Sequence, residues 1–123
     1  MSRARILIAE DEPNIAESLS FILTRAGFEV DTIANGADAL DRLRRQPFQA
    51  VILDVMLPGM NGFDVLRAIR TDRTIGGLPV IVLTAKGQTH DREMAEQIGA
   101  SAFIVKPFSN AHIVERVSHF VGA

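Results

Sequence analysis

Hydrophobic residues are concentrated in five short runs spread along the whole chain, at residues 5–9, 28–33, 50–53, 80–83 and 102–105. Each run is rich in Ile, Val or Leu and is short enough to indicate a β-strand. Four of them are apolar at nearly every position, whereas 28–33 alternates between apolar and polar residues. The pattern therefore predicts four strands covered on both faces and one strand at the edge of a sheet.

The segments between these runs carry apolar residues at helical spacing. Positions three or four apart lie on one face of a helix, so each segment is typical of an amphipathic helix packed against a core. The predicted stripes are Ile15, Leu19, Ile22 and Leu23; Ala39, Leu40 and Leu43; Phe63, Leu66 and Ile69; Met94, Ala95 and Ile98; and Ile113, Val114, Val117 and Phe120. Strand and helix therefore alternate five times.

Turn and cap residues stand where this pattern needs helix ends. Pro13 is placed for a first helical turn, and Gly27 and Gly99 follow helical stripes as left-handed C-terminal caps do. Asn35 and Ser109 stand where they can cap the second and the fifth helix. We see no linker or repeat, and we expect one domain over residues 1–123.

Repeated strand–helix units predict an α/β fold with a doubly wound parallel five-stranded sheet. A parallel pair needs a crossover of about a dozen residues or more, which the intervening helices supply. In the flavodoxin-like strand order, 2-1-3-4-5, the first and third strands are neighbours at the switch point of the winding. Ligands bind at that point, beyond the carboxyl ends of the strands.

Four of the five predicted strands end in chemically capable residues. Glu10 and Asp11 follow the first strand, Asp54 follows the third, Thr84 the fourth and Lys106 the fifth. Because parallel strands bring their carboxyl ends to one edge, we expect these side chains to share a small crevice. Each residue alone has a simpler role, such as capping a helix or facing solvent. The coincidence of all four strand ends favours a functional site.

The charges of this cluster favour a metal site and phosphoryl transfer. Two carboxylates ~4 Å apart repel by ~4 kcal/mol at an effective dielectric near 20, so three of them require positive charge nearby. Carboxylates without His or Cys suit Mg²⁺, and Lys106 supplies a second counter-charge. A metal ion, a lysine and a hydroxyl are the groups that phosphoryl transfer uses. Asp54 is then the nucleophile that forms an aspartyl phosphate.

Composition narrows the class of protein further. The net charge is −2 and the 13 Lys and Arg residues are scattered, which argues against direct nucleic-acid binding. The chain has no cysteine, which removes disulfides and thiolate metal sites and suits a reducing compartment. No apolar run approaches the ~18 residues of a membrane span. We therefore expect a cytoplasmic protein that does not bind membranes.

Four ordered segments resemble the receiver domains of bacterial two-component response regulators, and the similarity covers essentially the whole chain. Residues 6–12 (ILIAEDE) look like the first strand with its acidic pair, and residues 51–62 (VILDVMLPGMNG) look like the phosphoacceptor segment. Residues 80–85 (VIVLTA) and 106–108 (KPF) match the remaining two blocks. The resemblance implies a phosphoprotein that is phosphorylated in a Mg²⁺-dependent reaction and then changes its partner binding.

The resemblance also implies a role for each site residue. Asp54 matches the phosphoacceptor and Lys106 the lysine that pairs with the phosphate. Asp11 matches a direct Mg²⁺ ligand, Glu10 a neighbour that acts through water, and the backbone carbonyl of Met56 a third protein ligand.

The same resemblance implies two switch residues, a hydroxyl at Thr84 that moves to the phosphate and an aromatic at Phe103 that then turns inward. The bond before Pro107 is expected to be cis. The side chains of Met56 and Lys86 stand at positions that modulate the phosphoryl lifetime in the family.

The implied donor is a sensor histidine kinase or phosphotransfer protein, and the implied output is a downstream protein or domain bound by the fourth helix, fifth strand and fifth helix. Such a domain catalyses only its own phosphorylation and dephosphorylation. One alternative is a flavodoxin-like module for a small ligand, although residues 10–13 (EDEP) would repel a phosphate there. Another is an aspartyl-phosphate hydrolase, whose second aspartate would stand where this chain has Met56.

Overall fold

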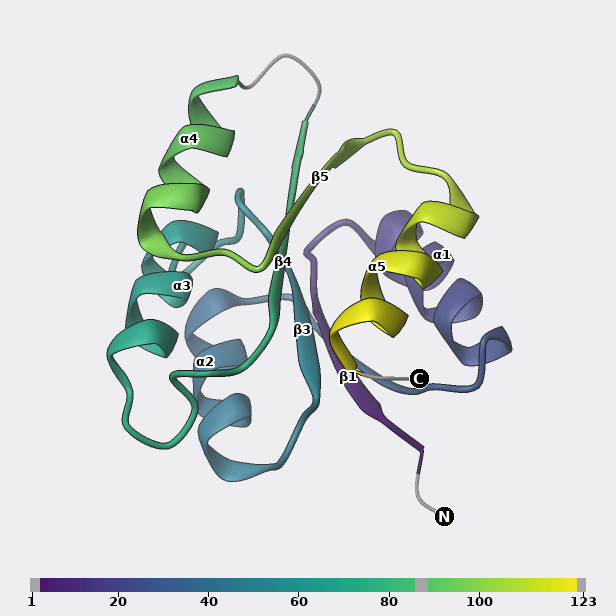
Figure 1. Cartoon of the computed structure of the whole chain (residues 1–123), viewed down its shortest axis with the longest axis horizontal. Coiled ribbons are helices and arrows are strands. Elements are labelled where there is room, and N and C mark those ends of the chain that lie inside the picture. Colours follow the sequence, from purple (N-terminus) through teal and green to yellow (C-terminus); the bar gives the residue numbers. More distant parts are fainter. Residues whose placement is uncertain (1–2, 86–88, 122–123) are drawn as a thin grey trace.

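Five strands and five helices alternate along the chain in the computed structural model, which describes residues 3–85 and 89–121 (Figure 1). The strands are β1 (Arg5–Ala9), β2 (Glu29–Ile33), β3 (Ala50–Asp54), β4 (Val80–Ala85) and β5 (Ala102–Lys106). The helices are α1 (Pro13–Arg25), α2 (Gly36–Arg45), α3 (Gly62–Thr71), α4 (Thr89–Ile98) and α5 (Asn110–Val121). Within these described residues, no helix has the length and apolar content needed to cross a membrane.

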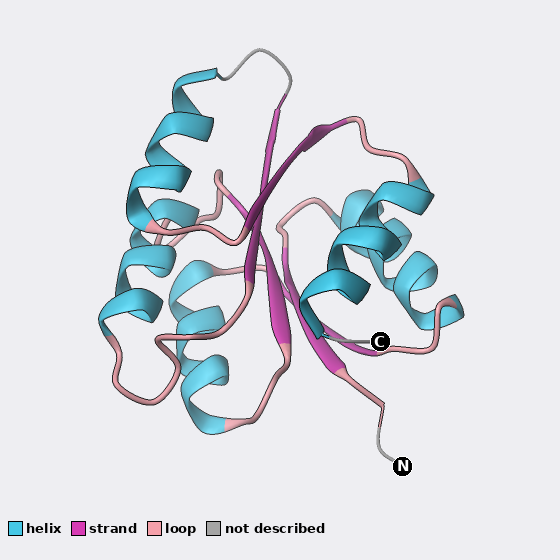
Figure 2. Cartoon of the chain, viewed as in Figure 1, coloured by secondary structure: helices cyan, strands magenta, loops and turns pink. Residues whose placement is uncertain are grey.

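The strands form one parallel sheet in the order β2-β1-β3-β4-β5, which confirms the predicted topology. Helices α1 and α5 cover one face of the sheet, and α2, α3 and α4 cover the other (Figures 1 and 2). Every residue of β3 is buried, whereas β2 has none that is fully buried. The alternating run was therefore correctly assigned to an edge strand, and β1 and β3 are neighbours as expected. The prediction that 102–105 is covered on both faces was wrong, because β5 forms the other edge of the sheet and Ile104 is its one fully buried residue.

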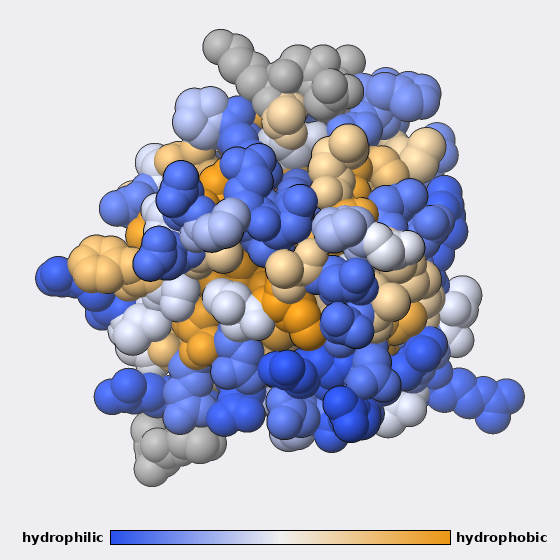
Figure 3. Space-filling view, turned by 180° about the vertical axis from the view of Figure 1, so that it is seen from behind, coloured by the Kyte–Doolittle hydropathy of each residue, from blue (hydrophilic) through white to orange (hydrophobic). Residues whose placement is uncertain are grey.

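Two hydrophobic clusters lie on the two faces of the sheet. Successive strand residues point to opposite faces, so each strand contributes to both clusters. Leu7, Val51, Leu53 and Val82 pack with α2, α3 and α4, while Ile8, Ile52, Ile81 and Leu83 pack with α1 and α5. On the side of the molecule opposite to that of Figure 1, hydrophobic residues show only in patches between hydrophilic ones (Figure 3). Most of the apolar side chains in the strands are thus used for the core.

Three strands extend further than the sequence predicted. We expected β3, β4 and β5 to stop before Asp54, Thr84 and Lys106, but these residues belong to the ladders. Asp54 pairs with Leu83 in the register of β3 and β4, and the pairing of β4 with β5 continues through Lys106. Strand pairing uses backbone groups, so a polar side chain does not interrupt it. At its amino-terminal end, β2 begins at Glu29, one residue later than the predicted start at Phe28.

The predicted helix ends are confirmed. Pro13 is the first residue of α1, and the Asn35 side chain accepts hydrogen bonds from two backbone N–H groups of α2. The Ser109 hydroxyl accepts one from the first turn of α5 at 3.1 Å. Gly27 and Gly99 follow α1 and α4 with φ angles of 101° and 114°, a left-handed conformation that glycine adopts without strain.

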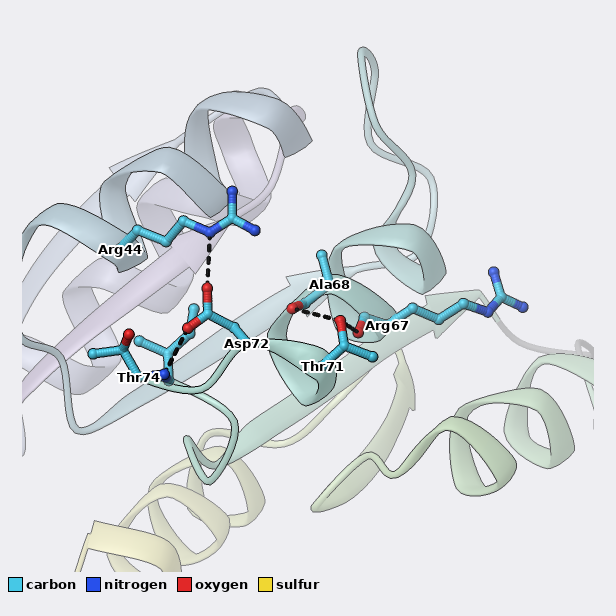
Figure 4. Close-up of polar contacts among 7 residues, drawn as sticks. Arg44, Arg67, Ala68, Thr71, Asp72 and Thr74 are labelled. Atoms are coloured by element: carbon cyan, nitrogen blue, oxygen red, sulfur yellow. Dashed lines mark hydrogen bonds and ion pairs between the residues drawn. The ribbon is translucent and has the colours of Figure 1, made fainter.

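The segment between α3 and β4 is held by polar contacts around Asp72 (Figure 4). The Asp72 carboxylate accepts hydrogen bonds from the backbone N–H groups of Thr74 and Ile75 and from Nε of Arg44, at 2.8, 3.2 and 3.0 Å. The two backbone donors are the main reason that the pKa of Asp72 lies below its usual value. This network lies at the amino-terminal edge of the sheet, away from the predicted site.

Arg70 joins two loops at the same edge, the one before β4 and the one before β5. Its Nε donates to the carbonyl of Gly99 at 2.8 Å, and its Nη1 donates to the carbonyls of Gly76 and Leu78 at 3.1 and 2.7 Å. Its Nη2 donates to the Ser101 hydroxyl at 3.3 Å. Through one guanidinium, α3 is therefore tied to the segments that precede β4 and β5.

We predict that Arg70→Met lowers the free energy of unfolding by about 2–4 kcal/mol, because three partly buried carbonyls lose their charged donor. Arg67→Met is the matched control on the same helix, and its exposed side chain predicts a change of about 0.5 kcal/mol or less. Urea unfolding followed by circular dichroism measures both, since the chain has no Trp or Tyr. Equal effects of the two substitutions would contradict the role of Arg70.

Candidate functional site

Three carboxylates meet at the carboxyl edge of the sheet, as the sequence predicted. Glu10 and Asp11 directly follow β1, and Asp54 is the last residue of β3. One oxygen from each of the three side chains lies within 4.8 Å of the others. The adjacency of β1 and β3 at the switch point is what brings these two chain segments together.

The three acids differ in burial. Glu10 and Asp54 are 2% and 3% exposed, whereas Asp11 is exposed to solvent. Glu10 also accepts a hydrogen bond from the backbone N–H of Glu12 at 3.1 Å. Two of the charges are therefore withdrawn from water, where they require nearby positive charge. The sequence did not indicate which member of the Glu10–Asp11 pair would be buried.

Lys106, the last residue of β5, places its ammonium group between the two buried acids. Its Nζ lies 3.0 Å from Oε1 of Glu10 and 3.4 Å from Oδ1 of Asp54. The contact with Asp54 is a hydrogen bond, whereas Oε1 of Glu10 has an ion-pair contact but no aligned hydrogen-bond donor among the described residues. Because β4 separates β5 from β3, only a long side chain can make this connection.

Burial and charge act in opposite directions on these groups. Burial is the main cause that raises the pKa of Glu10, and the nearby Asp54 charge adds to it, while Lys106 and the Glu12 backbone oppose it. Burial alone would lower the pKa of Lys106, but Glu10 and Asp54 outweigh it and hold that pKa above its usual value. The two carboxylates therefore favour the charged form of Lys106 in the crevice.

The donor set fits a divalent cation with oxygen ligands. Three carboxylates against one ammonium leave two negative charges unbalanced when all three acids are ionised. Oε1 of Glu10 is a buried oxygen without a hydrogen-bond donor among the described residues. Hard oxygen ligands of this kind suit Mg²⁺. Met56 is 78% exposed, so its side chain does not cover the carboxylates. A ligand role for its backbone carbonyl stays a prediction.

The loop that follows Asp54 packs tightly beneath it. The Gly62 N–H donates to the carbonyl of Val55 at 2.9 Å, and Asn61 caps α3 by accepting from a backbone N–H at 3.0 Å. A Cβ at Gly62 would lie 2.8 Å from Cα of Val55 and closer still to the carbonyl of Asp54. Glycine is therefore required here by the close approach of two backbone segments.

Thr84 lies at the same edge of the sheet, but its hydroxyl is hydrogen-bonded to α4 and not to the three carboxylates. It is 2% exposed, and its hydroxyl donates a 2.7 Å hydrogen bond to Oδ2 of Asp91 in the first turn of α4. Sequence reasoning missed Asp91. The available signal was an acidic residue at the start of a predicted helix. By itself, such a residue indicates only a favourable interaction between its charge and the helix dipole.

The remaining predicted residues are also placed by the structure. Phe103 is partly buried against the cluster under α2, α3 and α4, with the Arg92 guanidinium 5.7 Å from its ring centre. The Lys106–Pro107 bond is cis, as the resemblance implied. Lys86 lies outside the described residues. The three histidines, His90, His112 and His119, are exposed.

We predict that Asp54→Asn raises the free energy of unfolding by about 1 kcal/mol in the absence of divalent cations, because it relieves repulsion among the clustered acids. Lys106 keeps its ion pair with Glu10 in this variant. Chemical unfolding at low ionic strength in the presence of a chelator tests this. Glu17→Gln, which neutralises an exposed acid on α1, should change stability little. A less stable Asp54→Asn protein would contradict the proposed repulsion.

The fold and the site define a flavodoxin-like α/β domain with an acidic centre at its switch point. Residues 6–118 match the model of the response regulator receiver domain. The chain therefore belongs to the response regulator receiver family, and its function is that of a receiver domain in two-component signal transduction. This assignment selects the receiver interpretation over the flavodoxin-like module for a small ligand.

Curated relatives support the assignment. The chain is 42% identical over 115 residues to the DNA-binding response regulator MtrA of Mycolicibacterium smegmatis, covering 94% of this chain and 49% of that protein. It is 39% identical over 113 residues to the response regulator ArlR of Staphylococcus aureus, covering 92% of this chain and 50% of that protein. The chain thus spans about half the length of the curated relatives it matches.

Solved structures show the same fold. A response regulator from Chloroflexus aurantiacus superposes with a TM-score of 0.95 at 31% identity, over 99% of this chain and 100% of the other. The receiver domain of sensor histidine kinase PA1611 from Pseudomonas aeruginosa gives 0.91 at 30% identity, over 99% and 100%. That structure has a magnesium ion coordinated in the active site cleft. The chemotaxis response regulator CheY4 of Vibrio cholerae gives 0.89 at 28% identity, over 97% and 99%.

Proposed function

We propose that this domain accepts a phosphoryl group on Asp54 from the phosphohistidine of a sensor histidine kinase or a phosphotransfer protein. The observation that carries the proposal is the position of the Asp54 carboxylate. It is buried at the end of β3, within 4.8 Å of two further carboxylates, and it accepts a hydrogen bond from Lys106. Membership of the receiver family supports the same chemistry.

Glu10, Asp11 and Asp54, with the backbone carbonyl of Met56, would hold Mg²⁺. When bound, the ion supplies positive charge that neutralises the oxygens of a transferred phosphoryl group. The oxygen-only donor set supports this assignment, and so does Oε1 of Glu10, which is buried and accepts no hydrogen bond from the described residues. The magnesium ion in the PA1611 receiver domain supports it by analogy.

In the proposed reaction, a carboxylate oxygen of Asp54 attacks the phosphorus in line with the bond to the donor histidine. The new O–P bond forms as the P–N bond breaks, and its electron pair returns to the imidazole nitrogen of the donor. Lys106 is placed to contact the phosphoryl oxygens, because its ammonium already touches Asp54. The domain would act on no other substrate and would catalyse only its own phosphorylation and dephosphorylation.

The output would be carried by the face made of α4, β5 and α5. Thr84 would turn to the phosphoryl group and Phe103 would turn inward, changing this face. Charged side chains of both signs line a hollow of about 370 Å³ there, including Arg92, Glu96 and Arg116. Its partner would be a downstream protein or an output domain of a longer chain, as the DNA-binding relatives suggest by analogy. With a net charge of −2, residues 1–123 would not bind nucleic acid directly.

We also propose that the protein works in the cytoplasm, because the chain has no cysteine, which suits a reducing compartment. The receiver domain would occupy the whole of residues 1–123, slightly beyond the matched residues 6–118.

The first test is phosphorylation by a small-molecule donor. Acetyl phosphate and Mg²⁺ should add one phosphoryl group to the wild-type protein, because Asp54 is the only nucleophile that the proposal requires. Intact mass spectrometry measures the adduct. Asp54→Asn should form none, whereas the matched control Glu17→Gln should react like the wild type. An undiminished adduct on Asp54→Asn would refute the assignment.

The second test is metal binding. Mg²⁺ at about a hundred times its dissociation constant should raise the free energy of unfolding by about 2.7 kcal/mol. Asp11→Asn should remove most of this gain, because it deletes a carboxylate of the cluster while its exposed position spares the core. Unfolding curves with and without Mg²⁺ measure the difference. The same gain in Asp11→Asn and in the wild type would exclude Asp11 as a ligand.

A further inference from the structure

The hydroxyl of Thr84 has an acceptor outside the carboxylate cluster. Its 2.7 Å hydrogen bond goes to Oδ2 of Asp91, and both residues line a hollow of about 450 Å³ together with Met56 and Asn61, beside the end of β3. Thr84 is buried, so its hydroxyl is shielded from water and depends on a protein acceptor. In the structure described here, Asp91 is that acceptor.

A hydroxyl has one proton to donate, so Thr84 cannot donate to Asp91 and to a phosphoryl group at the same time. A charged acceptor makes the existing hydrogen bond one of the stronger kind. Asp91 is half-buried and has solvent available when Thr84 leaves it. The release of Thr84 therefore opposes phosphorylation by roughly the net strength of this one bond.

We propose that Asp91 is a positioning residue that holds Thr84 away from Asp54 until a phosphoryl group is present. Asp91 would thereby set how readily the domain changes from its unphosphorylated to its phosphorylated conformation. The proposal rests on the proposed function of Asp54 and Thr84. It adds a residue that no sequence motif indicated.

The position of Asp91 extends its effect to the output face. Asp91 belongs to the first turn of α4, and the next residue, Arg92, places its guanidinium over the Phe103 ring at 5.7 Å. One turn of helix thus contacts both residues that we expect to switch. When Thr84 leaves Asp91, the constraint on this turn changes, and the surroundings of Phe103 change with it.

The test is the affinity for beryllofluoride, a stable mimic of a phosphoryl group, at fixed Mg²⁺, measured by fluorine NMR. Asp91→Ala should bind it about tenfold more tightly than the wild type, because the competing acceptor is gone. That factor corresponds to about 1.4 kcal/mol. Asp91→Asn keeps a neutral acceptor and should give a smaller gain. Glu93→Gln, on the same helix, is the charge-matched control for Asp91→Asn and should bind like the wild type.

A double-mutant cycle with Thr84→Val separates the hydrogen bond from the charge of Asp91. Valine has the shape of threonine without the hydroxyl, so Asp91→Ala should change the affinity less than twofold in this background. An equal gain in both backgrounds would overturn the proposal and leave only charge repulsion. No gain from Asp91→Ala in the Thr84 background would overturn it as well, once circular dichroism shows that the variant is folded. Failure of the wild type to bind beryllofluoride would instead reject the proposed function itself.

Discussion

The site depends on one ammonium group that is shared by two buried carboxylates. Lys106 reaches both Glu10 and Asp54 from a strand that is adjacent to neither. Without it, two negative charges would be enclosed by apolar side chains, which is strongly unfavourable. With it, the cluster still carries excess negative charge, and this excess favours the binding of a divalent cation. The same arrangement therefore stabilises the resting fold and prepares it for phosphoryl chemistry.

The site divides into a rigid part and a part that can change partners. The ends of β1 and β3 are held by the fully buried centre of the sheet, and the close contact of Gly62 with the backbone after Asp54 leaves the acceptor little freedom. Thr84 and the first turn of α4 are instead joined by a side-chain hydrogen bond, which can be exchanged for another. A phosphoryl group on the rigid part would thus be sensed by the exchangeable part.

Local patterns were sufficient to predict much of the fold and the site. Hydrophobic spacing predicted five strands and five helices, their alternation predicted a parallel sheet, and the flavodoxin-like class of such sheets supplied the strand order. That order was enough to expect Glu10, Asp11 and Asp54 in one crevice with Lys106. Strand ends were less predictable, because the ladders through Asp54 and Lys106 depend on backbone pairing with a neighbour rather than on side-chain polarity.

The sequence by itself determined which residues could meet at one edge of the sheet, because strand periodicity and crossover geometry act locally along the chain. Only the tertiary structure decided that Glu10 is enclosed while Asp11 faces water, and that the Thr84 hydroxyl is bound by Asp91. Burial and hydrogen-bond choice depend on distances of a few ångströms between separate elements. Those distances are set by the packing of the whole domain, and no local pattern encodes them.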